Sequence, residues 1–271
     1  MKKLTLFLLA FVLIASACKK EPNDKKIDDE GKNPVTGGLA PSATQNGFAI
    51  NYTATWCGPC GYSGAPLIHA HAEKAPKGAI ITAHAQGDPM NNSLYGSFVF
   101  DRTITVGIPT FWIGDITTEE NTVKSMTTLL ESGDAAAGVD YSYEITGTTM
   151  TVKTKIKFFN PTGKKYFLSV LVLEDGIDGS STAGEYKQNG AITSYPNDDY
   201  HHDFVLRKSS IAGKAYGEEI ASSPVKNYVF EKTYTITLDA SWKDTYPVVI
   251  IWEKNTGDYP QYKYINSLKK K

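Results

Sequence analysis

The sequence predicts an α/β domain followed by an all-β sandwich. Segments typical of strands and helices alternate within residues 41–135, whereas residues 136–271 hold strand patterns without intervening helices. An apolar leader at residues 1–17 and a polar segment at residues 18–40 precede both domains. The chain of 271 residues is long enough for two domains of ordinary size.

The first residues have the pattern of a secretory signal. Lys2 and Lys3 precede an apolar run over residues 4–14, which is too short to span a bilayer as a stable helix. Small residues at 15–17 lead to Cys18, and this arrangement resembles a bacterial lipobox, in which the cysteine is acylated and becomes the mature N-terminus. We therefore expect lipidation at Cys18. The alternative is an ordinary signal peptide that happens to be cut beside a cysteine.

The segment after Cys18 reads as a flexible tether, because residues 19–39 are rich in charge, Pro and Gly and poor in large apolar side chains. The formal net charge of the chain is −1, and no basic stripe is interleaved with aromatic residues. These features do not indicate a nucleic-acid partner. A compartment beyond the inner membrane is oxidising, so a disulfide can persist there.

Residues 41–135 alternate between extended and helical patterns. "GAIITAHA" is short, β-branched and bounded by Gly78 and Gly87, as expected of a buried strand. Asp88 is the candidate N-cap of the helix that follows, with Pro89 at its first position. The expected elements are, in order, a strand at 48–54, a helix after Cys57, a strand at 78–85, a helix at 88–101, a strand at 106–115 and a helix at 118–133.

Residues 136–271 carry the period of two that half-buried strands show. In "TMTVKTKIKF", Met150, Val152 and Ile156 alternate with polar side chains such as Lys153 and Lys155. Several such strands without helices predict a sandwich of immunoglobulin-like size. Further strand candidates are "SYEIT", "YFLSVLVLED", "YVFEKTYTITLD", "YPVVIIWEK" and "YKYIN".

Two of the three cysteines lie within one turn, in Trp56-Cys57-Gly58-Pro59-Cys60. A cysteine at the start of a helix lies beside unpaired backbone N–H groups, which favour its thiolate. Pro59 suits a first helical turn, and Gly58 allows the close chain approach that an incoming disulfide needs. We expect Cys57 to attack a substrate disulfide and Cys60 to resolve the mixed disulfide.

At these residues the chain resembles the thioredoxin superfamily. "WCGPC" is the pentapeptide of thioredoxins, and "GIPTFWIG" at residues 107–114 is similar to the strand in which that family places a cis-proline opposite its thiols. The resemblance implies an α/β thioredoxin-like domain in which Pro109 is cis, Ile108 offers backbone atoms to an extended substrate and Thr110 continues the strand. Trp56 and Pro109 would shape the substrate groove, and no cofactor is implied.

Two positions depart from the thioredoxin pattern. Six residues before Cys57, where thioredoxins carry a buried aspartate that helps to move the proton of the second thiol, this sequence has Asn51, and an amide cannot titrate. Water or another group would then have to deprotonate Cys60. Pro66 lies one position later than the kink proline of the family, so we expect a shifted helix or a bulge.

The second half resembles the outer membrane protein 28 family, which comprises thioredoxin-like lipoproteins of Bacteroides-type bacteria. "VLEDGIDGS" at residues 172–180 and "DYHHDFVLRKSSIAGKAYGEEI" at residues 199–220 carry the resemblance. It implies an outer-membrane lipoprotein that faces the periplasm or the cell surface. Expected partners are protein disulfides or thiols, a membrane electron donor and the membrane itself through the lipid anchor.

A metal site is a competing interpretation of the cysteine pair, with His69 and His71 as further ligands. Residues two apart on a helix do not share a face, so we expect no metal there. The acidic and histidine cluster at residues 198–203 also invites a metal hypothesis. Strand alternation would place His201 and His202 on opposite faces and split those ligands.

Two hypotheses of function follow from these residues. The first is a lipid-anchored thiol-disulfide oxidoreductase in which Cys57 is the nucleophile and Cys60 the resolving thiol. The second is a surface binding or adhesion lipoprotein in which the two cysteines form a structural disulfide. Such a short ring gains little loop entropy, so it would be a poor structural staple.

Overall fold

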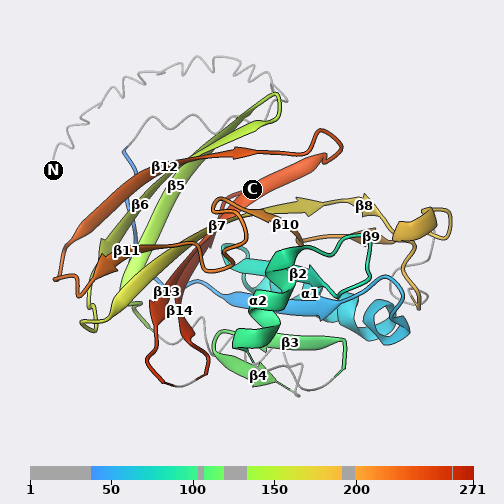
Figure 1. Cartoon of the computed structure of the whole chain (residues 1–271), viewed down its shortest axis with the longest axis horizontal. Coiled ribbons are helices and arrows are strands. Elements are labelled where there is room, and N and C mark those ends of the chain that lie inside the picture. Colours follow the sequence, from blue (N-terminus) through green and yellow to red (C-terminus); the bar gives the residue numbers. More distant parts are fainter. Residues whose placement is uncertain (1–37, 103–106, 119–132, 191–198, 258) are drawn as a thin grey trace, which may run out of the picture. The chain divides into compact units, whose positions relative to one another are not determined.

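The protein is mostly β, with few helices and mixed sheets (Figure 1). The computed structural model describes residues 38–102, 107–118, 133–190, 199–257 and 259–271. The signal peptide, Cys18, most of the tether and the helix expected at 118–133 lie wholly or mostly outside these residues. Within the described parts, no helix is both long and apolar enough to cross a membrane.

A nine-stranded sheet runs through the described chain in the order β14-β13-β7-β10-β2-β1-β3-β4, with β11 paired to β7. The pairings β1–β2 and β2–β10 are parallel, whereas the other pairings in this sheet are antiparallel. Its strands are β1 (Phe48–Thr53), β2 (Ala79–His84), β3 (Thr110–Ile113), β4 (Ile116–Thr118), β7 (Lys165–Asp175), β10 (Val205–Ser209), β11 (Glu218–Ser222), β13 (Asp244–Lys254) and β14 (Tyr262–Lys269).

Strand β10 joins the two halves of this sheet. Val205 pairs with Thr82 of β2 in parallel and with Glu174 of β7 in antiparallel register. The sheet therefore contains strands from both sides of the boundary predicted at residue 135, and that domain boundary stays a prediction.

A second layer of three strands, β12-β6-β5, covers part of the large sheet (Figure 1). These strands are β5 (Ala137–Thr146), β6 (Thr149–Phe158) and β12 (Val229–Thr237). The alternation predicted for β6 is confirmed, because its even-numbered residues from Met150 to Phe158 are buried. They share a core with Leu168, Val170 and Val172 of β7.

Strand β7 is buried on both faces, which explains its unbroken apolar sequence. Leu171 and Leu173 face a second core that also holds Trp252 of β13 and Phe48 of β1. A short antiparallel pair, β8 (Ile177–Asp178) with β9 (His201–His202), and a 3-10 turn, η2 (Gly184–Tyr186), lie in the connection from β7 to β10.

The helix that carries Cys60 contains a π turn, which confirms the expected bulge. The turn η1 (Cys60–Gly64) leads into α1 (Ala65–Lys74), and the Ala65 N–H bonds to the carbonyl of Cys60 five residues earlier. A π turn accommodates one extra residue, and Pro66 is the second residue of α1, directly after this turn.

The second helix begins later than predicted. Helix α2 spans Ser93–Asp101, and its N-cap is Asn92, whose side chain accepts the Leu94 N–H. The expectation that Asp88 caps this helix is wrong. Asp88 is buried, and its carboxylate accepts other backbone N–H groups, as described below.

Candidate functional site

Cys57 and Cys60 form a disulfide that lies in the loop and turn after β1. Strand β1 ends at Thr53, and a turn over Ala54–Trp56 leads to Cys57, which precedes the first helical residues. The Cys60 N–H lies 3.2 Å from Cys57 Sγ, so the helix start supplies a backbone donor to this sulfur. Both cysteines are buried, at 6% and 2% exposure.

Two aromatic side chains stand in solvent beside this buried disulfide. Trp56 is 53% exposed and Tyr62 is 59% exposed, and Pro59 is also exposed. An incoming polypeptide would therefore meet an apolar surface next to a disulfide that is itself nearly covered.

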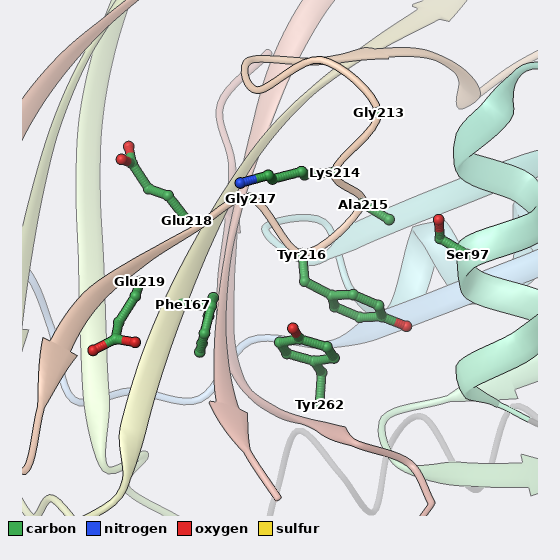
Figure 2. Close-up of a pocket in the computed structure, with 10 residues that line it drawn as sticks. All are labelled: Ser97, Phe167, Gly213, Lys214, Ala215, Tyr216, Gly217, Glu218, Glu219 and Tyr262. Carbon is green, nitrogen blue, oxygen red and sulfur yellow. The ribbon is translucent and has the colours of Figure 1, made fainter.

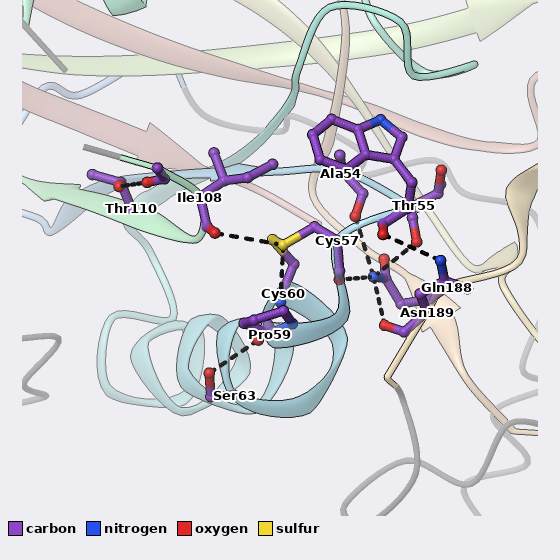
Figure 3. The surroundings of a disulfide bond; sticks show 12 residues. Ala54, Thr55, Cys57, Pro59, Cys60, Ser63, Ile108, Thr110, Gln188 and Asn189 are labelled. Carbon is purple, nitrogen blue, oxygen red and sulfur yellow. Dashed lines mark hydrogen bonds between the residues drawn. A yellow bond between two sulfur atoms is a disulfide. The ribbon is translucent and has the colours of Figure 1, made fainter. Parts of the chain in front are cut away.

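The segment around Pro109 lies against Cys57. Strand β3 pairs antiparallel with β1, with Tyr52 opposite Thr110, so the residues just before β3 reach the loop just after β1. The Ile108–Pro109 peptide is cis, as the thioredoxin resemblance implies, and Thr110 begins β3. Ile108 O lies 3.5 Å from Cys57 Sγ (Figure 3).

Gly64 allows the close contact of the π turn with this segment. A Cβ added at Gly64 would lie 3.0 Å from Pro109 Cβ, which is tighter than ordinary van der Waals contact. The cysteine pair, Ile108 and Pro109 are therefore brought together, as the sequence predicts for the substrate groove. Their catalytic and binding roles stay predictions.

The buried side chain of Asp88 fixes the backbone of the segment Ala54–Cys57, here called the cysteine loop. Its carboxylate accepts the Thr55 N–H at 2.6 Å and the Met90 N–H at 2.8 Å, and His84 Nδ1 lies 3.1 Å from it. Burial by itself would raise the pKa of Asp88, but His84 and the two N–H donors together lower that pKa to about 2. A buried, ionised carboxylate thus fixes the residue before Trp56.

His202 packs against the same cluster from β9. Its ring centroid lies 5.5 Å from that of His84, and its Nε2 lies 2.7 Å from the Tyr186 carbonyl oxygen. Burial lowers the pKa of His202 to about 3, and the neighbouring His84 adds to this effect. Neutral His202 therefore donates to Tyr186 and anchors the η2 turn. The expected alternation is confirmed, since His202 is buried and His201 is exposed.

Residues 188–190 contact the cysteine loop from the other side, and the sequence analysis missed them. Figure 3 shows Ile108 on one side of Cys57 and Gln188 with Asn189 on the other. Gln188 Nε2 donates to the Cys57 carbonyl at 3.0 Å. The only sequence signal is the Asn189-Gly190 dipeptide, which predicts a turn and nothing about its location.

Asn51, which stands at the position of the expected acid, is buried in β1 beside Thr82 of β2. Among the described residues, no hydrogen-bond partner reaches Asn51 Oδ1. A small cavity next to Asn51 is also lined by His69 and Asp203, whose side chains lie 3.4 Å apart. The carboxyl of Asp203 lines this cavity together with Asn51. Burial raises the pKa of Asp203.

The proposed histidine ligands do not gather around the cysteines. His71 is fully buried against Phe111, whereas His69 faces Asp203. Within the residues that the structure describes, no three His, Cys, Asp or Glu side chains are placed to hold a metal ion. The cluster at 198–203 is split as described above, although Asp198 itself lies outside the described residues.

A second pocket, of about 470 Å³, lies between β7, β11, β14 and the loop before β11 (Figure 2). Tyr216 and Tyr262 stack there at 4.0 Å, and Lys254 Nζ lies 3.9 Å from the Tyr262 ring centre. Glu218 and Glu219 pair with Lys232 and Lys165. The aromatic and acidic groups of this pocket thus already contact one another or nearby lysines.

Comparison with known proteins gives one match, and it is structural. No protein-family model and no curated protein matches the chain. Among solved structures, HBP35 of Porphyromonas gingivalis is similar with a TM-score of 0.65 and 17% sequence identity, over 84% of this chain and 75% of that chain. At this identity the likeness shows a shared fold alone, and the resemblance to the outer membrane protein 28 family rests on the sequence motifs.

Proposed function

We propose that the protein is a lipid-anchored thiol-disulfide oxidoreductase that acts on protein disulfides outside the cytoplasm. One observation carries the proposal. A Cys57–Cys60 disulfide lies at a helix start with the backbone of Ile108, which precedes cis-Pro109, 3.5 Å from the leading sulfur. This arrangement supports a groove in which a substrate chain would lie along the backbone of Ile108, beside the reactive bond.

The exchange proceeds through a mixed disulfide. In the dithiol form, the Cys57 thiolate attacks one sulfur of a substrate disulfide, a Cys57–substrate bond forms and the other substrate sulfur leaves as a thiolate. Cys60 loses its proton and attacks Cys57 Sγ, which releases the second substrate thiolate. Both released thiolates take up protons, so the substrate disulfide is reduced and the cysteine pair is oxidised. The reverse sequence oxidises a substrate dithiol.

The backbone supports the nucleophilic role of Cys57. The Cys60 N–H points at Cys57 Sγ from 3.2 Å, and a partial positive charge there stabilises a thiolate. Both cysteines are nearly covered, at 6% and 2% exposure, so the nucleophilic role of Cys57 is supported by this donor and by the contact with Ile108.

We propose a thioredoxin-like domain at residues 41–135 and an immunoglobulin-like sandwich at residues 136–271, in a chain related to the outer membrane protein 28 family. The parallel β1–β2 pair, the antiparallel β3 and the cis-Pro109 support the first part. The antiparallel β5-β6-β12 layer over β7 and β13 supports the second.

We also propose acylation at Cys18 and an outer-membrane location, facing the periplasm or the cell surface, with a membrane protein as electron donor. The lipobox-like residues 15–18 support the anchor. Globomycin treatment of cells and mass spectrometry of the N-terminal peptide test it. An uncut, unmodified Cys18 contradicts the anchor without bearing on the thiol chemistry.

The experiment that tests the oxidoreductase is reduction of insulin by the full chain in detergent, with dithiothreitol as the electron source. The wild type should accelerate the precipitation of insulin, and Cys57→Ser should abolish this. Cys60→Ser should trap a mixed disulfide. If wild type and Cys57→Ser are equally inactive, the enzyme proposal fails.

The competing proposal is a binding lipoprotein in which Cys57–Cys60 is structural, and the pocket lined by Phe167, Tyr216 and Tyr262 favours it. The reduction potential separates the two proposals. A structural disulfide lies below about −300 mV, whereas a working one lies above that value.

A further inference from the structure

Residues 188–190, here called the strap, fasten the cysteine loop from a distant part of the chain. They follow the η2 turn in the connection between β7 and β10. The Asn189 N–H donates to the Thr55 carbonyl at 2.8 Å, and Asn189 Nδ2 donates to the Trp56 carbonyl at 3.1 Å (Figure 3). The strap thus holds the main chain on the N-terminal side of Cys57.

The Gln188 side chain is the centre of this contact. It is 1% exposed, and its Nε2 lies 3.2 Å from the carbonyl oxygens of Ala54 and Thr55 and 3.0 Å from that of Cys57. The Asn189 carbonyl oxygen also lies 3.0 Å from Gln188 Nε2, and a primary amide has two N–H donors, so these carbonyls share them. These oxygens converge on one point and repel one another unless a donor lies between them. Without Gln188 these oxygens would keep only their backbone donors, the N–H groups of Cys57, Asn189 and Gly61, and their mutual repulsion would favour a moved loop.

Gly190 completes the strap by direct backbone contact. Its φ is +78°, and a Cβ at this position would lie 2.2 Å from the Gly58 carbonyl oxygen. Only glycine permits this approach. Gly58 was expected to allow a substrate to approach closely. On this side of the loop, Gly190 of the same chain lies against Gly58 instead. A substrate has to reach Cys57 from the side of Trp56 and Pro109.

We propose that Gln188 is a positioning residue that keeps the Cys57 main chain in place when the disulfide opens. In the oxidised form the Cys57–Cys60 bond itself restrains the loop. After reduction this covalent restraint is lost. The Cys57 carbonyl oxygen then still accepts two hydrogen bonds. One comes from Gln188 Nε2 at 3.0 Å, and the longer one comes from the Gly61 N–H at 3.4 Å. This inference rests on the proposed redox function.

The strap and the disulfide restrain the same loop, so each makes the other easier to form. By holding the Cys57 main chain after reduction, the strap keeps the Cys57 sulfur within reach of Cys60. Removing the strap should shift the redox equilibrium toward the dithiol, because the loop of the reduced form gains conformational freedom that is lost again when the disulfide forms. We expect a shift of roughly tenfold in the equilibrium constant, which corresponds to about 30 mV toward less negative potentials. A purely structural contact would destabilise both redox forms alike and would leave the equilibrium constant unchanged.

The test compares four full-length proteins, all carrying Cys18→Ser so that Cys57 and Cys60 are the only thiols. They are the otherwise unchanged chain, Gln188→Met, Gly190→Ala and the matched control Gly184→Ala. Gly184 also has a positive φ, of +63°, but a Cβ there would meet no atom within 4 Å. Each protein is equilibrated in glutathione buffers of known ratio, and the dithiol fraction is read from the mass added by alkylation.

Gln188→Met and Gly190→Ala should shift the equilibrium by roughly tenfold toward the dithiol, and Gly184→Ala should not. Equal equilibrium constants in all four proteins would overturn the proposal, as would a shift of the same size in Gly184→Ala. If Gln188→Met does not fold, Asn189→Ala, which removes only an exposed side-chain donor, replaces it with a smaller shift in the same direction. The measurement needs no enzymatic turnover, so an inactive wild type in the insulin assay contradicts the proposed function separately.

Discussion

The carboxylate of Asp88 accepts the backbone N–H of Thr55 at 2.6 Å, in a place where the Asp88 side chain has no exposed surface. Asp88→Asn removes the negative charge and turns one of the two acceptor oxygens into a donor, which would face the N–H of either Thr55 or Met90. We expect a loss of about 2 to 3 kcal/mol in the free energy of unfolding, measured by urea denaturation at pH 7.

The control for this substitution is Asp239→Asn. Asp239 also accepts a backbone N–H, that of Ser241, but it is exposed to water. Its replacement should leave the midpoint of urea denaturation nearly unchanged. Equal losses in the two variants would show that the Asp88 contact does not hold the loop.

His202 makes the stability of the protein depend on pH. Burial lowers its pKa from 6.5 in a model peptide to about 3 in the folded protein, so the unfolded chain binds the extra proton between these values. The contribution is present above pH 6.5 and is lost as the pH falls toward 3, by about 1.4 kcal/mol for each pH unit. His202→Gln should flatten the dependence of the unfolding free energy between pH 6.5 and 4.5.

Two features isolate this effect. The lowered pKa of Asp88 acts in a separate window, because its contribution is lost only as the pH falls from 3.8 through 2. His201→Gln is the matched control, since His201 is the exposed neighbour on β9. If the unfolding profiles of His202→Gln and the wild type remain parallel, buried neutral His202 is not the source of the slope.

Asn51→Asp should destabilise the protein in a way that grows with pH. The new carboxyl would be buried in β1 beside Thr82, so desolvation would raise its pKa above the value in the unfolded chain. The folded state would then bind the proton more tightly, and stability would fall as the pH rises above about 4. Urea denaturation at pH 5 and pH 8 should place the variant closer to wild type at pH 5. A gap that is larger at pH 5 would contradict this account.

Trp56→Ala should change substrate binding and leave the fold intact. Trp56 is 53% exposed, so its removal should cost no more than about 0.5 kcal/mol of stability. If the indole contacts protein substrates, the insulin reaction should slow by several fold while exchange with a small disulfide is unchanged. Tyr259→Ala, equally exposed at 53% but in the connection between β13 and β14, should leave both rates unchanged.

Much of the architecture could be predicted because it depends on local patterns. The alternation of apolar and polar residues along β6 indicates a strand with one buried face. The unbroken apolar run of β7 indicates a strand that is buried on both faces. The position of Pro66 predicted the bulge, since one extra residue between Cys60 and the proline must be absorbed by the helix. The cysteine pair and Pro109 were recognised by motif, and the structure places them together.

The features that were not predicted depend on contacts between distant residues. An Asp before Pro is typical of a helix start. Only the position of Thr55 in the folded chain shows that the Asp88 carboxylate instead accepts a backbone N–H from a distant loop. Gln188 lies in an irregular connection without periodicity, so no local pattern links it to Cys57. The pairing of β10 with β2 is similarly invisible, because parallel partners can be far apart in sequence.

The position of β10 has a consequence for how the chain matures. β2 is made early, yet the strand that covers its edge follows only after β7, late in synthesis. Until then the nascent chain carries an apolar strand with unpaired backbone groups, the kind of edge that recruits other chains into aggregates. The edge of β2 is therefore covered only once residues 205–209 are available to pair with it.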